Sequence, residues 1–221
     1  MTLRADGAPW RAGMARFWLG ASLLLLVVSP AWALAENAKV VQVEEDWELV
    51  LLEPDSAVTA PQLTCTISPY SQADTLRAAF DLNHASVPSF SAGGMQLQVW
   101  QGEQCVSTKR SREGQLLRNT GETIRWTVRM ELNSDEDWLK FAIRNGSSQS
   151  WGTFGTSGWF QLYVSSNLNS LDSYTSDVSV AQSGVGFAGN RVSSLVLKQV
   201  RRTWSDGQVT VDSNAKTVHP E

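Results

Sequence analysis

The stretch TIRWTVRMEL, Thr123 to Leu132, decides the fold class of this chain. Its apolar side chains recur at every second position, and polar side chains fill the positions between them. Such alternation is typical of a β-strand with one buried face and one wetter face, as in antiparallel sheets. We therefore expect a strand here whose buried face carries Ile124, Trp126, Val128, Met130 and Leu132.

Similar patterns recur on both sides of this strand. Alternation is present in LTCTI (63–67), MQLQVW (95–100), WLKFAIR (138–144) and GWFQLYV (158–164). Two segments, WELVLL (47–52) and SSLVLKQV (193–200), are apolar on both faces, as expected near the middle of a sheet. Turn-forming stretches such as SAGG, NTGE and SDG separate the strands, and 167–176 is the most loop-like segment. No helix is expected, and many short strands with frequent turns predict an all-β antiparallel sandwich.

The first 35 residues have the layout of a secretory signal peptide. A basic start precedes the apolar run FWLGASLLLLVV (17–28), and Ala33-Leu34-Ala35 has the small-x-small form that a signal peptidase recognises. A retained membrane anchor is the alternative, but the apolar run is shorter than the roughly 20 residues that span a bilayer. We therefore expect cleavage after Ala35 and a single secreted domain over 36–221, extracellular or periplasmic and without a membrane anchor.

Charge and cysteine content narrow the functional classes. The formal net charge is −4, and a mildly acidic chain with mixed charges argues against nucleic acid as a partner. The two cysteines, Cys65 and Cys105, are most simply expected to form one disulfide in a secreted chain. A metal site or a catalytic thiol is the rival interpretation, poorly supported because the only histidines are His84 and His219.

The strand faces opposite the expected core mix aromatic and polar side chains in an unusual way. Flat rings stack on the apolar face of a sugar, amides and charged groups hydrogen-bond its hydroxyls, and binding pockets in general combine these two kinds of group. We therefore predict a non-catalytic module that binds an oligo- or polysaccharide. The candidate ligand-binding residues are Gln98, Trp100, Arg125, Arg129, Glu131, Trp138, Trp159, Gln161 and Tyr163.

Two other interpretations stay open. In the first, the outer rings only stabilise the sheet, and the protein has a structural or surface-interaction role. In the second, the protein is a glycosidase-like enzyme in which Glu48 and Glu131 supply the carboxylate pair that glycoside hydrolysis needs. No serine nucleophile elbow, zinc-protease motif or phosphate-binding loop supports another enzyme class.

Calcium is the one cofactor that the sequence suggests. The acidic turn 135–137, Asp135-Glu136-Asp137, and the pair Asp172 and Asp177 could supply oxygen ligands, although short acidic turns are more often simply solvated. Between the strands at 138–144 and 158–164, we expect Trp151 and Phe154 to fold back onto the edge of the sandwich.

Two longer stretches resemble known proteins. They are LKFAIRNGSSQSWGTFG (139–155) and SVAQSGVGFAGNRVSSLVLKQVR (179–201). Both resemble segments of uncharacterised secreted bacterial proteins, in a layout similar to a concanavalin A-like or laminin-G-like sandwich. The resemblance implies a jelly-roll or concanavalin A-like arrangement of the antiparallel strands. The ExDxxE strand motif of the glucanase branch is missing from this sequence, so the resemblance does not extend to hydrolase chemistry.

Overall fold

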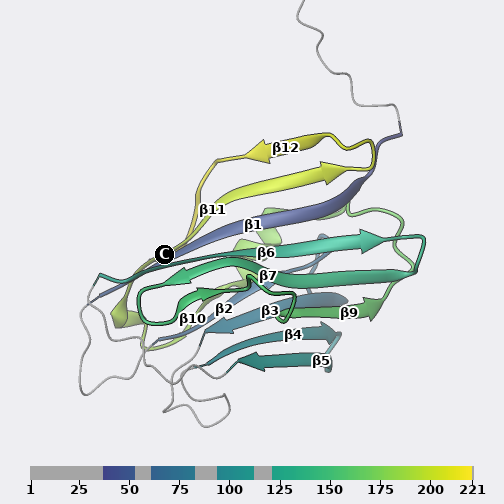
Figure 1. Ribbon diagram of the computed structural model, residues 1–221. Coiled ribbons are helices and arrows are strands. Elements are labelled where there is room, and N and C mark those ends of the chain that lie inside the picture. Colours follow the sequence, from purple (N-terminus) through teal and green to yellow (C-terminus); the bar gives the residue numbers. More distant parts are fainter. Residues whose placement is uncertain (1–36, 53–60, 83–93, 112–120, 221) are drawn as a thin grey trace, which may run out of the picture. The chain divides into compact units, whose positions relative to one another are not determined.

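Two antiparallel sheets make up most of the protein in the computed structural model (Figure 1). The structure describes residues 37–52, 61–82, 94–111 and 121–220, all within one compact unit, Leu34–Glu221. Within these residues the larger sheet has eight strands in the order β12-β11-β1-β6-β7-β8, with β13 also paired to β11 and β9 to β7. Its strands are β1 (Val40–Leu51), β6 (Thr123–Asn133), β7 (Trp138–Ser148), β8 (Gly152–Phe154), β9 (Gln161–Ser165), β11 (Val192–Trp204), β12 (Val209–Asp212) and β13 (Lys216–His219).

The smaller sheet has five strands in the described part of the chain, in the order β10-β2-β3-β4-β5. They are β10 (Gly184–Phe187), β2 (Gln62–Ile67), β3 (Leu76–Leu82), β4 (Met95–Gln101) and β5 (Gln104–Ser111). The helical segments described are α1 (Ser176–Gln182) and the short 3-10 helix η1 (Gly189–Arg191). The predicted all-β antiparallel sandwich is therefore confirmed.

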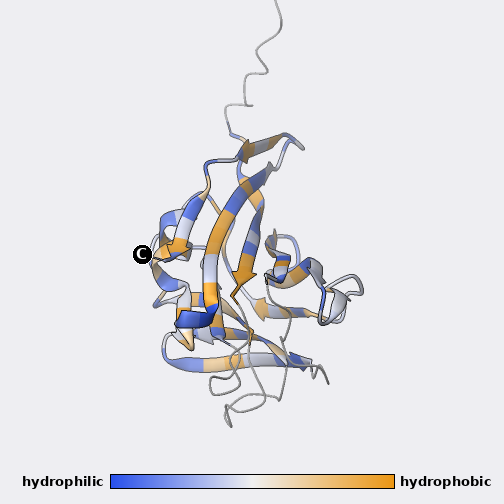
Figure 2. Cartoon of the chain, turned by 90° about the vertical axis from the view of Figure 1, so that its left-hand side faces the viewer, coloured by the Kyte–Doolittle hydropathy of each residue, from blue (hydrophilic) through white to orange (hydrophobic). Residues whose placement is uncertain are grey.

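The core lies between the two sheets and follows the predicted alternation. All the expected inward side chains of β6 are buried, and hydropathy alternates along the strands (Figure 2). Phe80 of the smaller sheet joins the layers, because its ring centroid lies 5.8 Å from those of both Trp126 and Phe160. Burying a large apolar side chain contributes roughly 1.5–3 kcal/mol, so this shared core holds the two sheets together.

The predicted disulfide is wrong. Cys65 on β2 and Cys105 on β5 are both free, and two strands of the same sheet separate them. Neighbouring strands are about 4.8 Å apart, which puts the strands that carry these cysteines roughly 14 Å apart. A disulfide needs Cα atoms within about 7 Å of each other. Moreover, Cys65 is buried in the core whereas Cys105 is exposed.

The expectation of no helix is also wrong. Residues Ser176–Gln182 form α1, which begins after Thr175, and the Thr175 hydroxyl accepts a hydrogen bond from the Asp177 backbone N–H at 3.3 Å. Threonine is a favoured residue at this position because it satisfies an N–H group that the first helical turn leaves open. The sequence does not indicate this helix, because Val178 and Val180 alternate with polar residues, as they would in a strand.

The connection after β7 folds back as predicted. Phe154 is only 9% exposed and belongs to the core, and the half-buried Trp151 packs against it with ring centroids 6.4 Å apart. Gly152 and Gly155 have φ values of +71° and +70°, a region that glycine enters without strain. These two turns let the connection return along β7 and place Phe154 over the core.

The proposed signal peptide at 1–35 lies outside the described residues, so its cleavage stays a prediction. Among the described residues, no helix has the length and apolar character needed to cross a membrane. His84 likewise lies outside the part of the chain that the structure describes.

Candidate functional site

The outer face of the larger sheet, which points away from the smaller sheet, is crossed by ion pairs. Glu44 on β1 lies between Arg129 of β6 and Arg201 of β11, at 2.6 Å and 2.8 Å. Burial alone would raise the pKa of Glu44, but hydrogen bonds and charge from Arg201 and Arg129 outweigh it and lower the pKa. Arg129, a predicted ligand-binding residue, therefore links β6 to β1 through its ion pair with Glu44.

Aromatic and polar side chains gather further along this face, on β7 and β9. The rings of Trp138 and Tyr163 meet edge to face, with centroids 5.4 Å apart and planes at 82°. Lys140 pairs with Tyr163 across the two strands, and its ammonium lies 5.6 Å from the Trp138 centroid. Gln161 donates a hydrogen bond to the Tyr163 hydroxyl at 2.9 Å. We call Glu136, Trp138, Lys140, Gln161 and Tyr163 the ring cluster.

The ring cluster is held in place by two carboxylates. The Trp138 indole N–H donates to Glu136 Oε2 at 2.6 Å, which fixes the plane of the ring. Glu131 on β6 forms an ion pair with the Lys140 ammonium at 2.5 Å and so supports the cluster from the neighbouring strand. Because these contacts are already made, ordering the rings around a ligand costs little additional conformational entropy.

An open pocket of about 490 Å³ adjoins the ring cluster. Its lining residues carry carboxylates, hydroxyls and an amide, and Glu136 belongs to both the pocket and the cluster. The Ser166 N–H donates to the Asp137 carbonyl at 2.9 Å, which joins the two loops that form the pocket. The lining residues are Glu136, Asp137, Ser165, Ser166 and Asn167.

Sequence reasoning missed this pocket. The sequence suggests only calcium for the turn at 135–137, and Ser165, Ser166 and Asn167 carry no signal of their own. A pairing of Trp138 with Ser165 brings the two loops together, and such pairing depends on the register between β7 and β9 rather than on any local motif.

Of the remaining predicted ligand-binding residues, Arg125 lies on this face, where it pairs with Glu48 at 2.8 Å, and the other three do not. Gln98 and Trp100 lie on β4 of the smaller sheet, where the Arg77 guanidinium is 5.4 Å from the Trp100 ring centroid. Trp159 precedes β9 and is 59% exposed, with the Lys109 ammonium 4.5 Å from its ring centroid. Lys109 belongs to β5, so Trp159 lies where β9 and the edge of the smaller sheet meet. The candidate residues are therefore divided among separate surfaces.

The carboxylate pair suggested for a glycosidase is too widely separated. Glu131 on β6 is opposite Gln42 of β1, and Glu48 lies six residues further along β1. At about 3.3 Å per residue, this is a separation of about 20 Å. The two carboxyl groups of glycosidases are roughly 5 to 10 Å apart, so Glu48 and Glu131 are not such a pair.

Asp172 and Asp177, the pair suggested for calcium, are engaged elsewhere. Asp172 accepts a hydrogen bond from the Val40 N–H at 2.9 Å, and Asp177 accepts the Lys216 ammonium at 2.6 Å. Within the described ranges, no three histidine, cysteine or acidic side chains are grouped as a metal ion would require.

The carboxylate of Glu45 is wholly buried, and the sequence gives no signal that singles it out. It accepts hydrogen bonds from the Tyr174 hydroxyl at 2.8 Å and from the Trp47 indole N–H at 3.0 Å. Burial raises its pKa to about 7, against the opposing effect of the neighbouring Ser179, Tyr174 and Trp47. Because no solvent reaches Glu45, it belongs to the core and not to the candidate site.

The ring cluster and its pocket are thus the place where rings, amides, hydroxyls and carboxylates converge on an accessible surface. The chemical interpretation of this surface depends on its geometry, since sequence comparison supplies no relative whose site could be transferred. No protein-family model matches the chain, and no curated protein matches it at a significant level.

Proposed function

We propose that this protein is a secreted, non-catalytic module that binds carbohydrate at the ring cluster and the pocket beside it. The observation that carries the proposal is the edge-to-face pair of Trp138 and Tyr163 on an accessible sheet face, with Tyr163 50% exposed. An aromatic surface of this kind suits the apolar face of a sugar ring. Exposed aromatic rings bordered by hydrogen-bonding groups are the usual composition of a binding site.

The polar groups around the rings suit the hydroxyls of a sugar. Glu136 and Asp137 can accept hydrogen bonds, the Asn167 amide can both donate and accept, and Ser165 and Ser166 offer hydroxyls. This composition supports hydrogen bonding to a sugar.

The same proposal includes the secreted location and the particular type of β-sandwich. The signal-peptide pattern at 1–35 supports export, and the two-sheet arrangement is compatible with a jelly-roll or concanavalin A-like sandwich. An oligo- or polysaccharide outside the cell is the partner that this combination favours.

The test is a glycan array probed with the wild-type protein and with two single-ring variants. Tyr163→Ala removes an exposed ring of the cluster, and Trp100→Ala removes a ring from the other sheet as a matched control. We expect Tyr163→Ala to lose at least tenfold in affinity for the bound glycan with little change in melting temperature, and Trp100→Ala to keep its affinity.

Two results would contradict the proposal. One is an array without any wild-type hit. The other is a glycan whose binding depends on Trp100 and not on Tyr163. If, instead, Tyr163→Ala lowers the melting temperature and no glycan binds, the rings have the structural role that is the alternative function.

A further inference from the structure

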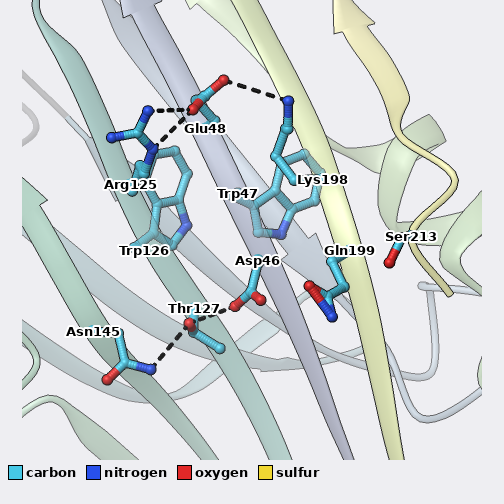
Figure 3. Close-up of a pocket in the computed structure, with 10 residues that line it drawn as sticks. All are labelled: Asp46, Trp47, Glu48, Arg125, Trp126, Thr127, Asn145, Lys198, Gln199 and Ser213. Carbon is cyan, nitrogen blue, oxygen red and sulfur yellow. Dashed lines mark hydrogen bonds and ion pairs between the residues drawn. The ribbon is translucent and has the colours of Figure 1, made fainter. Parts of the chain in front are cut away.

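A second pocket, of about 510 Å³, opens on the outer face of the larger sheet over β11, β1, β6 and β7 (Figure 3). It is separate from the ring cluster. Thr127 lies in this pocket, and Asn133, the partner of Trp138, is six residues further along β6. At about 3.3 Å per residue, the two sites are about 20 Å apart.

Two β-bulges border this pocket at the same level of the sheet. On β11, Gln199 is opposite Asp46 and Leu197 is opposite Trp47, so Lys198 is an extra residue. On β7, Arg144 is opposite Thr127 and Ser147 is opposite Arg125, which leaves one extra residue between them.

Asn145 and Gly146 lie between these two pairs in the β7 bulge, and Asn145 is the polar one. Its φ of +52° is left-handed, and its exposed side chain donates to the Thr127 hydroxyl at 3.4 Å. Bulges redirect side chains and are common beside functional sites. Here both bulges direct an additional polar residue, Asn145 and Lys198, into one pocket. We call Asp46, Glu48, Arg125, Thr127, Asn145 and Lys198 the bulge pocket.

One end of the bulge pocket carries an excess of positive charge. Glu48 is shared by Arg125, at 2.8 Å, and Lys198, at 3.6 Å, so two cations face one carboxylate. The Arg125 and Lys198 side chains are 60% and 49% exposed, whereas Glu48 is 20% exposed. The Lys198 contact is the longer of the two, and exposed ion pairs contribute at most about 1 kcal/mol. Lys198 can therefore turn toward a ligand at little cost.

The other end of the pocket is a group of hydrogen-bonding side chains. Figure 3 shows Asp46, Thr127 and Asn145 together there, away from the Glu48 end. Asp46 accepts from the Thr127 hydroxyl at 2.6 Å. Gln199 also lines this end, so donors and acceptors are both present.

We propose that the bulge pocket binds a carboxylate-bearing, hydroxyl-rich molecule, of which a uronic acid is the simplest example. Its carboxylate would lie at the Arg125 and Lys198 end, because guanidinium and ammonium groups are the preferred partners of carboxylates. Its hydroxyls would donate to Asp46 and accept from the amides of Asn145 and Gln199. This inference goes beyond the proposed function, since it concerns a different pocket and a different ligand chemistry.

Calorimetry with three probes tests the proposal. Sodium glucuronate represents a free sugar acid, polygalacturonate represents uronate residues in a polymer, and glucose is the uncharged control. We expect glucuronate or polygalacturonate to bind at least tenfold more tightly than glucose, and the binding to weaken as salt is raised. Binding of both acids indicates recognition of the free acid, and binding of polygalacturonate alone indicates recognition within a polymer.

Two variants test whether the sugar acid binds in the bulge pocket. Lys198→Gln removes an exposed cation, and Asn145→Gly keeps the left-handed backbone of the bulge while removing the amide. We expect each to lower the affinity at least fivefold without lowering the melting temperature. Tyr163→Ala, in the ring cluster, serves as the control and should leave this binding unchanged.

The proposal is overturned if neither acid binds, if glucose binds as tightly as glucuronate, or if affinity depends on Tyr163 and not on Lys198. None of these outcomes changes the interpretation of the glycan array, which tests the ring cluster and not the bulge pocket. Conversely, glucuronate binding that depends on Lys198 supports the bulge pocket even when the ring cluster binds no glycan.

Discussion

Phe154 lies directly on Gly146: a Cβ atom built on this glycine would be 2.1 Å from the Phe154 ring. The two residues pair across β7 and β8, and the Phe154 ring also lies 6.5 Å from Phe80 in the core. The absence of a side chain on Gly146 is therefore what allows the connection after β7 to close over the sandwich.

We expect Gly146→Ala to destabilise the protein by about 1–3 kcal/mol, the usual cost of forcing extra volume into a packed core. Urea denaturation followed by tryptophan fluorescence measures the change. Gly184→Ala is the matched control, because a Cβ on Gly184 meets nothing within 4 Å. An unchanged midpoint for Gly146→Ala would show that Phe154 can move aside.

The buried Glu45 should make stability depend on pH in the direction opposite to that of most carboxylates. The folded protein holds this proton up to about pH 7, whereas the ordinary pKa is 4.5. Since the folded state binds more protons in this range, the free energy of unfolding falls as pH rises from about 4.5 to about 7. Glu45→Gln should flatten that decline.

Chemical denaturation at several pH values checks this expectation. The difference between wild type and Glu45→Gln is the informative quantity, because burial also raises the pKa of Asp81. Glu103→Gln, in an exposed turn, is the control and should follow the wild-type curve. Parallel curves for wild type and Glu45→Gln would mean that Glu45 does not hold its proton.

The free thiols predict a simple pattern of alkylation. Cys105 is exposed and should react with iodoacetamide in the folded protein. Cys65 is buried and its pKa is raised by burial, so it should react only after denaturation. Mass spectrometry should find one adduct in the native protein and two in urea. A reducing agent should leave the melting temperature unchanged, and a shift would indicate a disulfide.

The two faces of the larger sheet should tolerate charge very differently. Phe141 is fully buried, so Phe141→Asp should prevent accumulation of folded protein, because it buries an unpaired carboxylate. Arg125→Ser, on the exposed face, should change stability by less than about 1 kcal/mol. Yields of soluble protein and melting temperatures give the comparison, and a normal yield of Phe141→Asp would refute this assignment of faces.

Much of the fold was predictable because period-two alternation is a local property. The pattern from Ile124 to Leu132 predicts the buried face of β6, and the same kind of alternation accounts for the burial of Phe141 and Leu162. The cysteine prediction failed because a count carries no information on strand order. Only the order of the smaller sheet shows that Cys65 and Cys105 are too far apart.

The candidate site was predictable only in part, and for the same reason. Trp138, Gln161 and Tyr163 were assigned to the outer face by alternation, and pairing of β7 with β9 brings them together. Trp100 lies on a strand with similar alternation, β4, but this strand belongs to the smaller sheet. Pairing between distant segments decided which residues became neighbours, and no single strand encodes it.

The central position of β1 in the larger sheet affects how the chain can fold during synthesis. β1 is near the start of the described chain, yet it pairs with β11, and its Glu44 binds Arg201, 157 residues away. One edge of β1 stays without its partner until the segment Val192–Trp204 has emerged. Contacts so distant in sequence form slowly, and open strand edges favour aggregation. Holding the nascent chain unfolded until β11 has emerged would therefore protect this protein, and a chain that stops before Val192 would keep an aggregation-prone edge permanently.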